Sequence, residues 1–366
     1  MGSGYAIIMR ALIFLAPLLV AATLPKAAMP LPPPAPAIII AHRGASAERP
    51  EHTLAAYERA IEQGADFIEP DLVSTKDHQL VARHENEISG TTDVASRPEF
   101  ADRKATKTID GEAVTGWFTE DFTLAELRTL KARERLPQLR PANADFDGQF
   151  AIPTLDEIIA LAKAATARTG RPIGIYPETK HPSYFRGIGL PLEPVLLAAL
   201  ARTGWTTAAA PVFIQSFEVD NLKALKALTG VRLIQLMAAS GRSADGYDYA
   251  ALSSPDGLKQ VAAYAAGIGP ERAMIIPRDA AGRMGAATSL VVDAHAVGLA
   301  VHPWTFRPEN YFLPFELKAG DDPRGRGDVE AEIRAYLATG VDGIFSDSTA
   351  AAVRALAPVQ ANPARN

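Results

Sequence analysis

The sequence of 366 residues contains no cysteine. This absence excludes disulfide bonds, thiolate zinc sites, iron–sulfur clusters, cysteine nucleophiles and lipid anchors attached to cysteine. Any metal ion that the chain binds must therefore be held by carboxylates, carbonyl groups or imidazoles.

Positive charge is not in excess either. Lys and Arg number 37 against 42 for Asp and Glu, which gives a formal net charge of −5. No strongly basic stretch is present, so we expect no nucleic-acid partner. Hydrophobic residues make up 48% and charged residues 22% of the chain, which is typical of a folded globular protein.

The chain also lacks an apolar run near the N-terminus that is long enough to cross a membrane. Residues 11–24 are apolar but are interrupted by Pro17, whereas a spanning helix needs about 20 apolar residues. The length of this run and the small residues after it predict a signal peptide over residues 1–28. A proline-rich tether follows over residues 29–36. We expect a periplasmic or secreted protein without stable membrane insertion, the alternative being an N-terminal membrane anchor.

From residue 37 onward, short apolar runs alternate with segments of helical periodicity. Eight such strand–helix units favour a closed parallel barrel over an open sheet, so we expect an α/β protein with a (βα)8 TIM barrel. The sixth strand fits residues 266–269 or residues 273–276 equally well. The other strands are predicted at residues 37–41, 66–73, 173–176, 212–215, 232–237, 299–304 and 342–346. The helices are predicted at residues 53–64, from about Thr154, and at 193–202, 219–228, 258–265 and 329–337.

One further strand-like run, residues 79–83, does not fit the parallel pattern. It follows the second strand after only a few residues, and parallel neighbours need a crossover of about a dozen residues or more. The two runs must therefore form an antiparallel hairpin that folds about Asp77. This hairpin is expected to bring His84 back beside Asp71.

Residues 85–150 are polar, charged and rich in turn-forming residues, with one helical segment around residues 124–132. A structureless loop of this length is rare in a compact domain. We expect a small inserted subdomain beside the mouth of the barrel, after the second strand and its hairpin. The barrel domain then spans residues 37–358, and residues 359–366 form a C-terminal tail.

Acidic residues gather where barrel strands are predicted to end, which is where such barrels carry their sites. Glu69 and Asp71 are two positions apart on one strand and so face the same side, and Glu178 ends the next barrel strand. Three carboxylates without a thiolate suit a hard divalent cation. The alternative is a buried ion network in which these acids pair with Arg43, Lys180 or other bases.

Two histidines approach the same place from different elements. His42 follows the first strand, and His84 follows the hairpin return. Because imidazoles titrate near neutral pH, one can accept a proton while the other donates one. The other histidines are interpreted as surface residues or as support behind the site: His52, His78, His181, His295 and His302.

Basic and aromatic candidates for substrate binding surround these positions. Arg43 offers a planar guanidinium suited to phosphate oxygens, although a salt bridge at the barrel rim would also account for it. Lys180 lies two residues after Glu178 and adds a positive charge on the same face. Phe217 and Trp304 follow later strands, where aromatic residues pack in the core about as often as they line a ligand.

A series of motifs occurs in order along the chain, from about Ile38 to Ala355. The motifs are HRGAS at residues 42–46, PEHT at 50–53, EPD at 69–71, LVARH at 80–84, TDVA at 92–95, IGIYPETK at 173–180, QSF at 215–217, GIGP at 267–270, VHPWT at 301–305 and VDGIFSD at 341–347. This series resembles the glycerophosphodiester phosphodiesterases, and more closely their exported (periplasmic) bacterial type.

The resemblance implies a (βα)8 barrel that hydrolyses glycerophosphodiesters, which are deacylated phospholipids, to an alcohol and sn-glycerol 3-phosphate. It also implies one divalent cation, with calcium favoured over magnesium. The implied roles are general acid and base for His42 and His84, phosphate binding for Arg43, and metal ligation for Glu69, Asp71 and Glu178.

Two positions depart from the family pattern. The residue after the second histidine is usually Asp but is Glu85 here, which leaves open whether this carboxylate orients His84. Pro70 lies inside the acidic pair and is expected to tilt Glu69 relative to a more regular strand.

Two other functions stay open at this point. A related barrel phospholipase would attack intact phospholipid head groups, and would require an exposed apolar rim or a basic amphipathic helix, neither of which is evident. A catalytically silent binding protein would keep the fold but would have lost a histidine or a carboxylate, and all of them are present.

Overall fold

The computed structural model describes residues 1–2 and 37–357. The predicted signal peptide, tether and C-terminal tail fall almost entirely outside these ranges, so the periplasmic or secreted location stays a prediction. Among the described helices, none combines the length and the apolar character needed to cross a membrane.

The strands and helices alternate along the chain as the sequence predicts. The strands are β1 (Ile38–His42), β2 (Phe67–Glu69), β3 (Asp71–Ser74), β4 (Leu80–Ala82), β5 (Ala105–Ile109), β6 (Glu112–Gly116), β7 (Gly174–Ile175), β8 (Glu178–Thr179), β9 (Phe213–Ser216), β10 (Arg232–Met237), β11 (Gly267–Pro270), β12 (Ala300–Val301) and β13 (Gly343–Ser346). The α-helices are α1 (Leu54–Gln63), α2 (Leu124–Leu127), α3 (Pro141–Ala144), α4 (Leu155–Thr169), α5 (Pro182–Gly187), α6 (Leu192–Arg202), α7 (Val219–Leu228), α8 (Tyr249–Leu252), α9 (Pro255–Val261), α10 (Leu290–Ala296), α11 (Val329–Leu337) and α12 (Thr349–Leu356).

The barrel strands pair in parallel in two runs, β13-β1-β2-β7 and β12-β11-β10-β9-β8-β3, and β4 is added antiparallel to β3. Prolines divide two barrel strands, because Pro70 separates β2 from β3 and Pro177 separates β7 from β8. A proline cannot donate to the ladder, but its carbonyl still accepts. Glu178 N donates to Pro70 O and Gln215 N to Pro177 O, both at 2.9 Å. The ring therefore continues through both interruptions.

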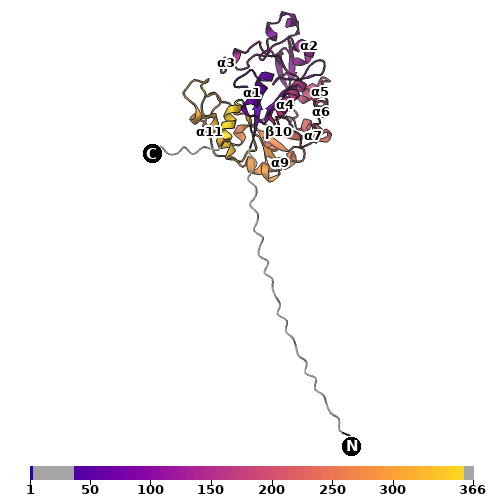
Figure 1. Ribbon diagram of the computed structural model, residues 1–366, viewed down its shortest axis with the longest axis vertical. Coiled ribbons are helices and arrows are strands. Elements are labelled where there is room, and N and C mark those ends of the chain that lie inside the picture. Colours follow the sequence, from indigo (N-terminus) through magenta and orange to yellow (C-terminus); the bar gives the residue numbers. More distant parts are fainter. Residues whose placement is uncertain (3–36, 358–366) are drawn as a thin grey trace. The chain divides into compact units, whose positions relative to one another are not determined.

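The ring closes between the last two strands. Asp342 N donates to Val301 O at 2.9 Å, and Phe306 N donates to Phe345 O at 2.8 Å. Helices such as α4, α6, α7, α9 and α11 surround the strands in Figure 1. The predicted α/β fold with a (βα)8 barrel is confirmed.

The sixth strand is β11, so residues 266–269 are the better of the two predicted ranges. The alternative, residues 273–276, falls largely on the 3-10 helix Arg272–Met274 and its C-terminal end. The seventh strand is much shorter than predicted, because Pro303 follows it closely and removes a ladder donor.

Alternate residues of the strands fill the barrel interior. Ile40, Phe67, Tyr176, Phe213, Ile234 and Phe345 form this inner cluster. His302 also lies inside, only 2% exposed, with its Nδ1 2.8 Å from the Tyr176 hydroxyl. Of the two interpretations given to His302, a surface position is therefore excluded, because the side chain is buried against Tyr176 inside the barrel.

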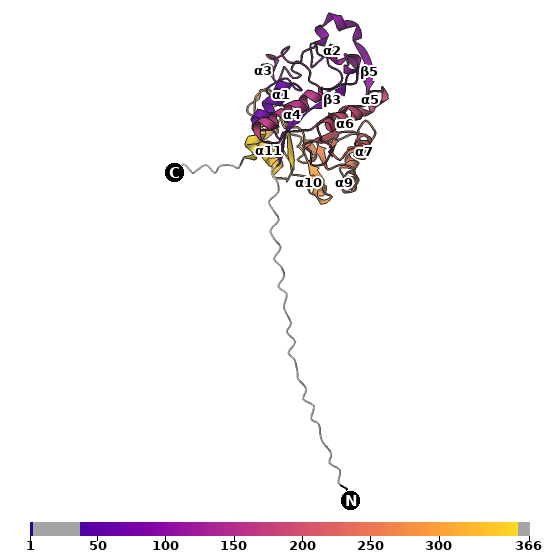
Figure 2. The ribbon, with the colours of Figure 1, turned by 45° about the vertical axis from the view of Figure 1, so that its right-hand side comes forward.

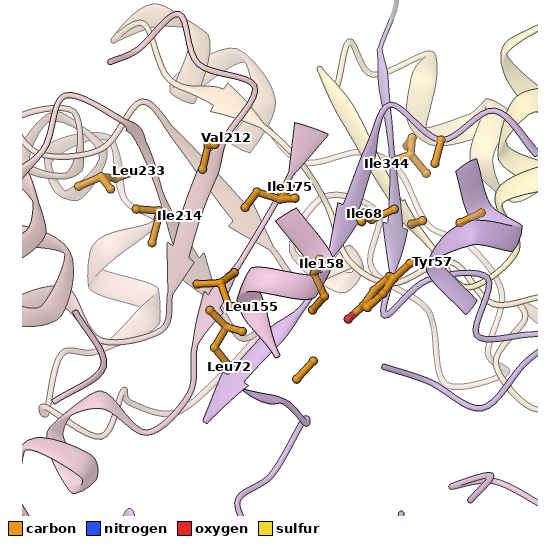
Figure 3. Close-up of a cluster of buried hydrophobic side chains, with 14 of the residues drawn as sticks. Tyr57, Ile68, Leu72, Leu155, Ile158, Ile175, Val212, Ile214, Leu233 and Ile344 are labelled. Carbon is orange, nitrogen blue, oxygen red and sulfur yellow. The ribbon is translucent and has the colours of Figure 1, made fainter. Parts of the chain in front are cut away.

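The larger core lies between the outer face of the strands and the helices. Ile68 and Leu72 pack outward toward Leu155 and Ile158 of α4 (Figure 3). Helix α4 begins at the predicted place because Thr154 and Glu157 form a capping box. The helices thus bury one apolar face against the sheet, as expected for this architecture.

The predicted hairpin is present as β3 and β4. Leu72 lies opposite Ala82, and Arg83 N donates to Asp71 O at 2.9 Å. The next residue is His84, so the hairpin brings it to the end of the strand that carries Asp71, as the sequence predicts.

Between β4 and α4 the chain forms the antiparallel hairpin β5–β6 and short helices, which appear in violet at one end of the barrel in Figure 2. The helix expected around residues 124–132 is limited to α2. Buried side chains of this segment, among them Phe100, Trp117 and Phe122, belong to the same cluster as the barrel core. The segment is therefore packed onto the barrel, and its apolar side chains do not form a separate core.

The turn after β1 depends on a glycine. Gly44 has φ +88°, and a Cβ there would lie 2.6 Å from the backbone carbon of Ala56. We predict that Gly44→Ala lowers the thermal unfolding temperature markedly, because it adds this clash to the usual cost of about 1–2 kcal/mol for a left-handed residue. Gly246→Ala is the matched control, since Gly246 has φ +90° with open space around it. Equal shifts for both variants would contradict this account.

Candidate active site

A cavity of about 210 Å³ lies at the carboxyl ends of the barrel strands. Of the nine site residues predicted from the sequence, all except Asp71 line it, and Asp71 is the strand neighbour of the lining residue Glu178. The lining members are His42, Arg43, Glu69, His84, Glu178, Lys180, Phe217 and Trp304. Residues spread over more than 260 positions of the chain thus meet at one place, because parallel strand ends converge at the mouth of a closed barrel.

Glu69, Asp71 and Glu178 form a buried acidic group. One carboxylate oxygen from each lies within 4.8 Å of the others. Glu69 ends β2, Asp71 begins β3, and Asp71 is the register partner of Glu178 on β8. The predicted juxtaposition of the three carboxylates is therefore what the register of adjacent strands produces.

The three carboxylates do not ionise equally. Burial and the charge of Asp71 raise the pKa of Glu69, and burial raises the pKa of Glu178 to about 8 although Lys180 opposes this shift. For Asp71, burial alone would raise the pKa, but Arg43, His52 and Lys180 lower it well below the ordinary value. Asp71 therefore keeps its charge, while the two glutamates resist ionisation next to it.

Arg43 is both paired and open to the cavity. Its Nη1 lies 3.1 Å from Glu51 Oε1, and its Nε lies 3.2 Å from Asp71 Oδ2. Its backbone N–H donates to Glu69 Oε2 at 2.8 Å, from a left-handed conformation with φ 59°. The ion pairs match the salt-bridge interpretation from the sequence, and the side chain also lines the cavity. Phosphate binding by Arg43 stays a prediction. Glu51 was not predicted as a partner, although it lies in the motif PEHT.

Asp347 was not assigned a site role from the sequence, yet it holds His42. Asp347 Oδ1 lies 2.6 Å from His42 Nδ1, and Oδ2 lies 2.6 Å from Arg140 and 3.1 Å from Arg307. Burial, together with Arg43, lowers the pKa of His42 to about 4 despite Asp347. The signal was available, because Asp347 ends the motif VDGIFSD, but its partner could be identified only from the closed ring.

His84 is the more accessible histidine of the pair, with 31% of its side chain exposed. Its Nδ1 lies 2.9 Å from Glu85 Oε1. The longer carboxylate at this position therefore does contact the histidine, and whether it orients the ring stays open. Burial and the charges of Arg43 and Lys180 lower the pKa of His84.

Lys180, Phe217 and Trp304 also line the cavity. Lys180 Nζ lies 3.0 Å from Glu178 Oε1 and 5.9 Å from the centre of the Phe217 ring. The rings of Phe217 and Trp304 meet edge to face at 5.8 Å, and Trp304 Nε1 donates to Gly269 O at 2.8 Å. The two aromatic side chains pack on each other and line the cavity at the same time.

Two further arginines, which no sequence motif indicated, also line the cavity. Arg135 comes from the segment between β4 and α4 and lies 2.9 Å from Glu51, and Arg307 follows β12. Both positions depend on how loops fold over the barrel mouth, which strand and helix periodicity does not encode.

His52 supports the acidic group from behind. It is fully buried, with Nε2 2.9 Å from Asp71 Oδ2 and Nδ1 2.8 Å from the Tyr57 hydroxyl. Of the two interpretations given to this histidine, support behind the site is the one that the contacts match.

The residues fit a hard divalent cation. The donors are carboxylate oxygens, and the side chain of Gln215 lies beside them, donating to Glu69 Oε1 at 3.0 Å. The Gln215 Oε1 atom is buried without a hydrogen-bond partner and belongs to a residue that lines the cavity. Such an oxygen next to acids that resist ionisation is consistent with a site completed by a cation.

The fold and the site define a (βα)8-barrel protein with histidines and carboxylates at the carboxyl ends of its strands. The family model described as the glycerophosphoryl diester phosphodiesterase family matches residues 42–351. The chain belongs to this family.

Two curated relatives agree with this assignment. The chain is 38% identical over 324 residues to a glycerophosphodiester phosphodiesterase of Arabidopsis thaliana, covering 85% of this chain and 83% of the relative. It is 30% identical over 297 residues to the glycerophosphodiester phosphodiesterase of Haemophilus influenzae, covering 74% and 79%. The family and the enzyme class predicted from the motifs are confirmed, and the exported bacterial subtype stays a prediction.

Solved structures share the fold. A glycerophosphodiester phosphodiesterase of Agrobacterium tumefaciens matches with a TM-score of 0.55 and 19% identity, covering 87% of this chain and 99% of that one. A phosphodiesterase of Oleispira antarctica, in complex with the product sn-glycerol 3-phosphate, matches with a TM-score of 0.57 and 20% identity, covering 88% and 97%.

Asp347→Asn tests the orientation of His42. We predict that this variant loses about 10–100-fold in kcat on a glycerophosphodiester, because an ordered acid–base histidine needs its partner. Asp342→Asn is the control, since Asp342 binds His295 at 2.8 Å before β13, at the other end of the strand. A folded Asp347→Asn protein with unchanged kcat would show that the contact is not needed.

Proposed function

We propose that the protein hydrolyses glycerophosphodiesters to an alcohol and sn-glycerol 3-phosphate with one bound divalent cation and two acid–base histidines. The observation that carries this proposal is the convergence of His42, His84 and the acidic group on one cavity. The product seen in the Oleispira antarctica phosphodiesterase is of the same chemistry.

Positive side chains would hold the phosphate. Arg43, Arg135, Lys180 and Arg307 all reach the cavity lining. Arg43 is fixed by its two acidic partners, so its guanidinium is preorganised before a substrate arrives. Phe217 and Trp304 offer an apolar wall for the carbon atoms of the glycerol.

The two histidines would move the protons. Hydrolysis of the diester requires the oxygen that attacks phosphorus to lose a proton and the departing alkoxide to gain one. Each histidine has its Nδ1 bound to a carboxylate, Asp347 for His42 and Glu85 for His84. This leaves Nε2 of each ring as the atom that exchanges a proton with the substrate.

Glu69, Asp71 and Glu178 would hold the cation, with the Gln215 side chain beside them. When bound, a divalent cation neutralises phosphate charge and polarises an oxygen of the substrate. We propose calcium in preference to magnesium, because calcium accepts a larger and less regular set of oxygen ligands.

A direct assay tests the activity. We predict that the purified protein cleaves glycerophosphocholine, and that excess chelator or the isosteric Glu178→Gln substitution removes at least about 99% of the rate. Intact phosphatidylcholine is the comparison substrate, because preferential cleavage of it would favour the phospholipase alternative. Full activity in excess chelator would overturn the requirement for a divalent cation. If neither substrate is hydrolysed, the catalytically silent binding protein is favoured.

The acidic group also predicts how stability depends on pH. Burial raises the pKa of Glu178 to about 8 in the folded protein, so the cation-free folded state holds protons that the unfolded state has lost. The contribution of Glu178 to the stability of this state is therefore fully present at low pH and is lost as pH rises from about 4.5 toward 8, by up to about 1.4 kcal/mol per pH unit. We expect a calcium-induced rise in Tm that is larger at pH 8 than at pH 5.

The control for this measurement is Glu178→Gln, which cannot ionise. Its Tm should fall less over the same pH range and should respond weakly to calcium. A wild-type Tm that shows the same response to calcium at both pH values would contradict the linkage between protons and cation.

A further inference from the structure

A series of paired side chains runs from His84 to the β5–β6 hairpin. His84 Nδ1 lies 2.9 Å from Glu85 Oε1, and Glu85 Oε2 lies 2.8 Å from His181 Nε2. On its other side, His181 Nδ1 lies 2.6 Å from Asp110 Oδ2. Both ring nitrogens of His181 and both carboxylate oxygens of Glu85 therefore have partners within this series of side chains.

The members come from three separate elements. Glu85 follows β4, His181 follows β8, and Asp110 lies in the turn between β5 and β6. Asp110 and His181 both have left-handed backbone conformations, with φ 48° and 46°. A non-glycine residue with this conformation costs free energy and persists where surrounding contacts demand it. Here the conformations point two side chains from distant parts of the chain at each other.

Glu85 needs this support because of its length and exposure. Its side chain is 47% exposed, so without a second contact its rotatable bonds would be free to swing into solvent. His181 is much less exposed, at 13%, and its contacts with Asp110 and Glu85 raise its pKa to about 9 although burial opposes this. A positive imidazolium thus lies between two carboxylates and fixes the second oxygen of Glu85.

We propose that His181 and Asp110 are positioning residues for the reaction, which fix Glu85 so that it orients the His84 ring toward the cavity. This inference rests on the proposed function, because it assigns His84 a catalytic role. The β5–β6 hairpin then contributes to catalysis through Asp110 without touching the substrate.

The test is a double-mutant cycle on kcat. His181→Ala is expected to lower kcat about tenfold with KM changed less than twofold, and Glu85→Gln to lower kcat by about 10–100-fold. Because His181 acts through Glu85, the double variant should be no slower than Glu85→Gln alone. Asp110→Asn, which preserves side-chain size, should lower kcat in the same direction as His181→Ala.

The control is His295→Ala, which removes a histidine that also pairs with an aspartate, Asp342, outside the cavity lining. It should leave kcat unchanged, and thermal unfolding of all variants checks that they are folded. Unchanged kcat in folded His181→Ala, or losses that multiply in the double variant, would overturn the proposal.

Nuclear magnetic resonance of the histidine rings separates this proposal from the proposed function. The His84 ring resonances are expected to shift in His181→Ala and in Asp110→Asn, and the His181 pKa to fall from about 9 toward 6.5 in Asp110→Asn. If the His84 resonances are unchanged in both variants, the positioning proposal is overturned even when the wild-type enzyme is active. If the wild-type protein is inactive but the variants show these shifts, the proposed function is overturned, while the positioning of His84 through Glu85, His181 and Asp110 is supported.

Discussion

The mutual repulsion of three buried carboxylates is the constraint around which the site is organised. Glu69, Asp71 and Glu178 lie within 4.8 Å of one another and are almost inaccessible to solvent. Such a group is costly unless positive charge or protons compensate it. Arg43 and Lys180 supply part of that charge from the same strand ends, and both side chains also line the cavity. Binding of cation and substrate would complete the compensation.

Compensation of carboxylates by positive charge also explains how the histidines are held. Each is bound through Nδ1 to a carboxylate that is itself fixed by cationic groups: Asp347 by two arginines, and Glu85 by His181. The carboxylates remain charged because of these partners, and a charged carboxylate fixes both the tautomer and the direction of the ring. The departure from Asp to Glu85 is accommodated because a longer side chain reaches a second partner.

Much of the fold could be predicted because it depends on local periodicity. The limits of α7 and α11 agree with the predicted ranges, as does β10, and the β3–β4 hairpin follows from a connection too short for a parallel crossover. The shortened β12 and the contacts of the insertion could not be predicted, because they depend on prolines at strand ends and on packing between distant segments.

The sequence by itself determined the barrel, the family and the set of chemical groups at the strand ends, because these depend on residue type, spacing and order along the chain. Only the tertiary structure decided which groups are partners. Asp347 meets His42 because the last strand pairs with the first, and Asp110 meets His181 because a hairpin folds across a barrel mouth. Pairings of this kind are set by ring closure and loop packing over long separations, and no local pattern of residues encodes them.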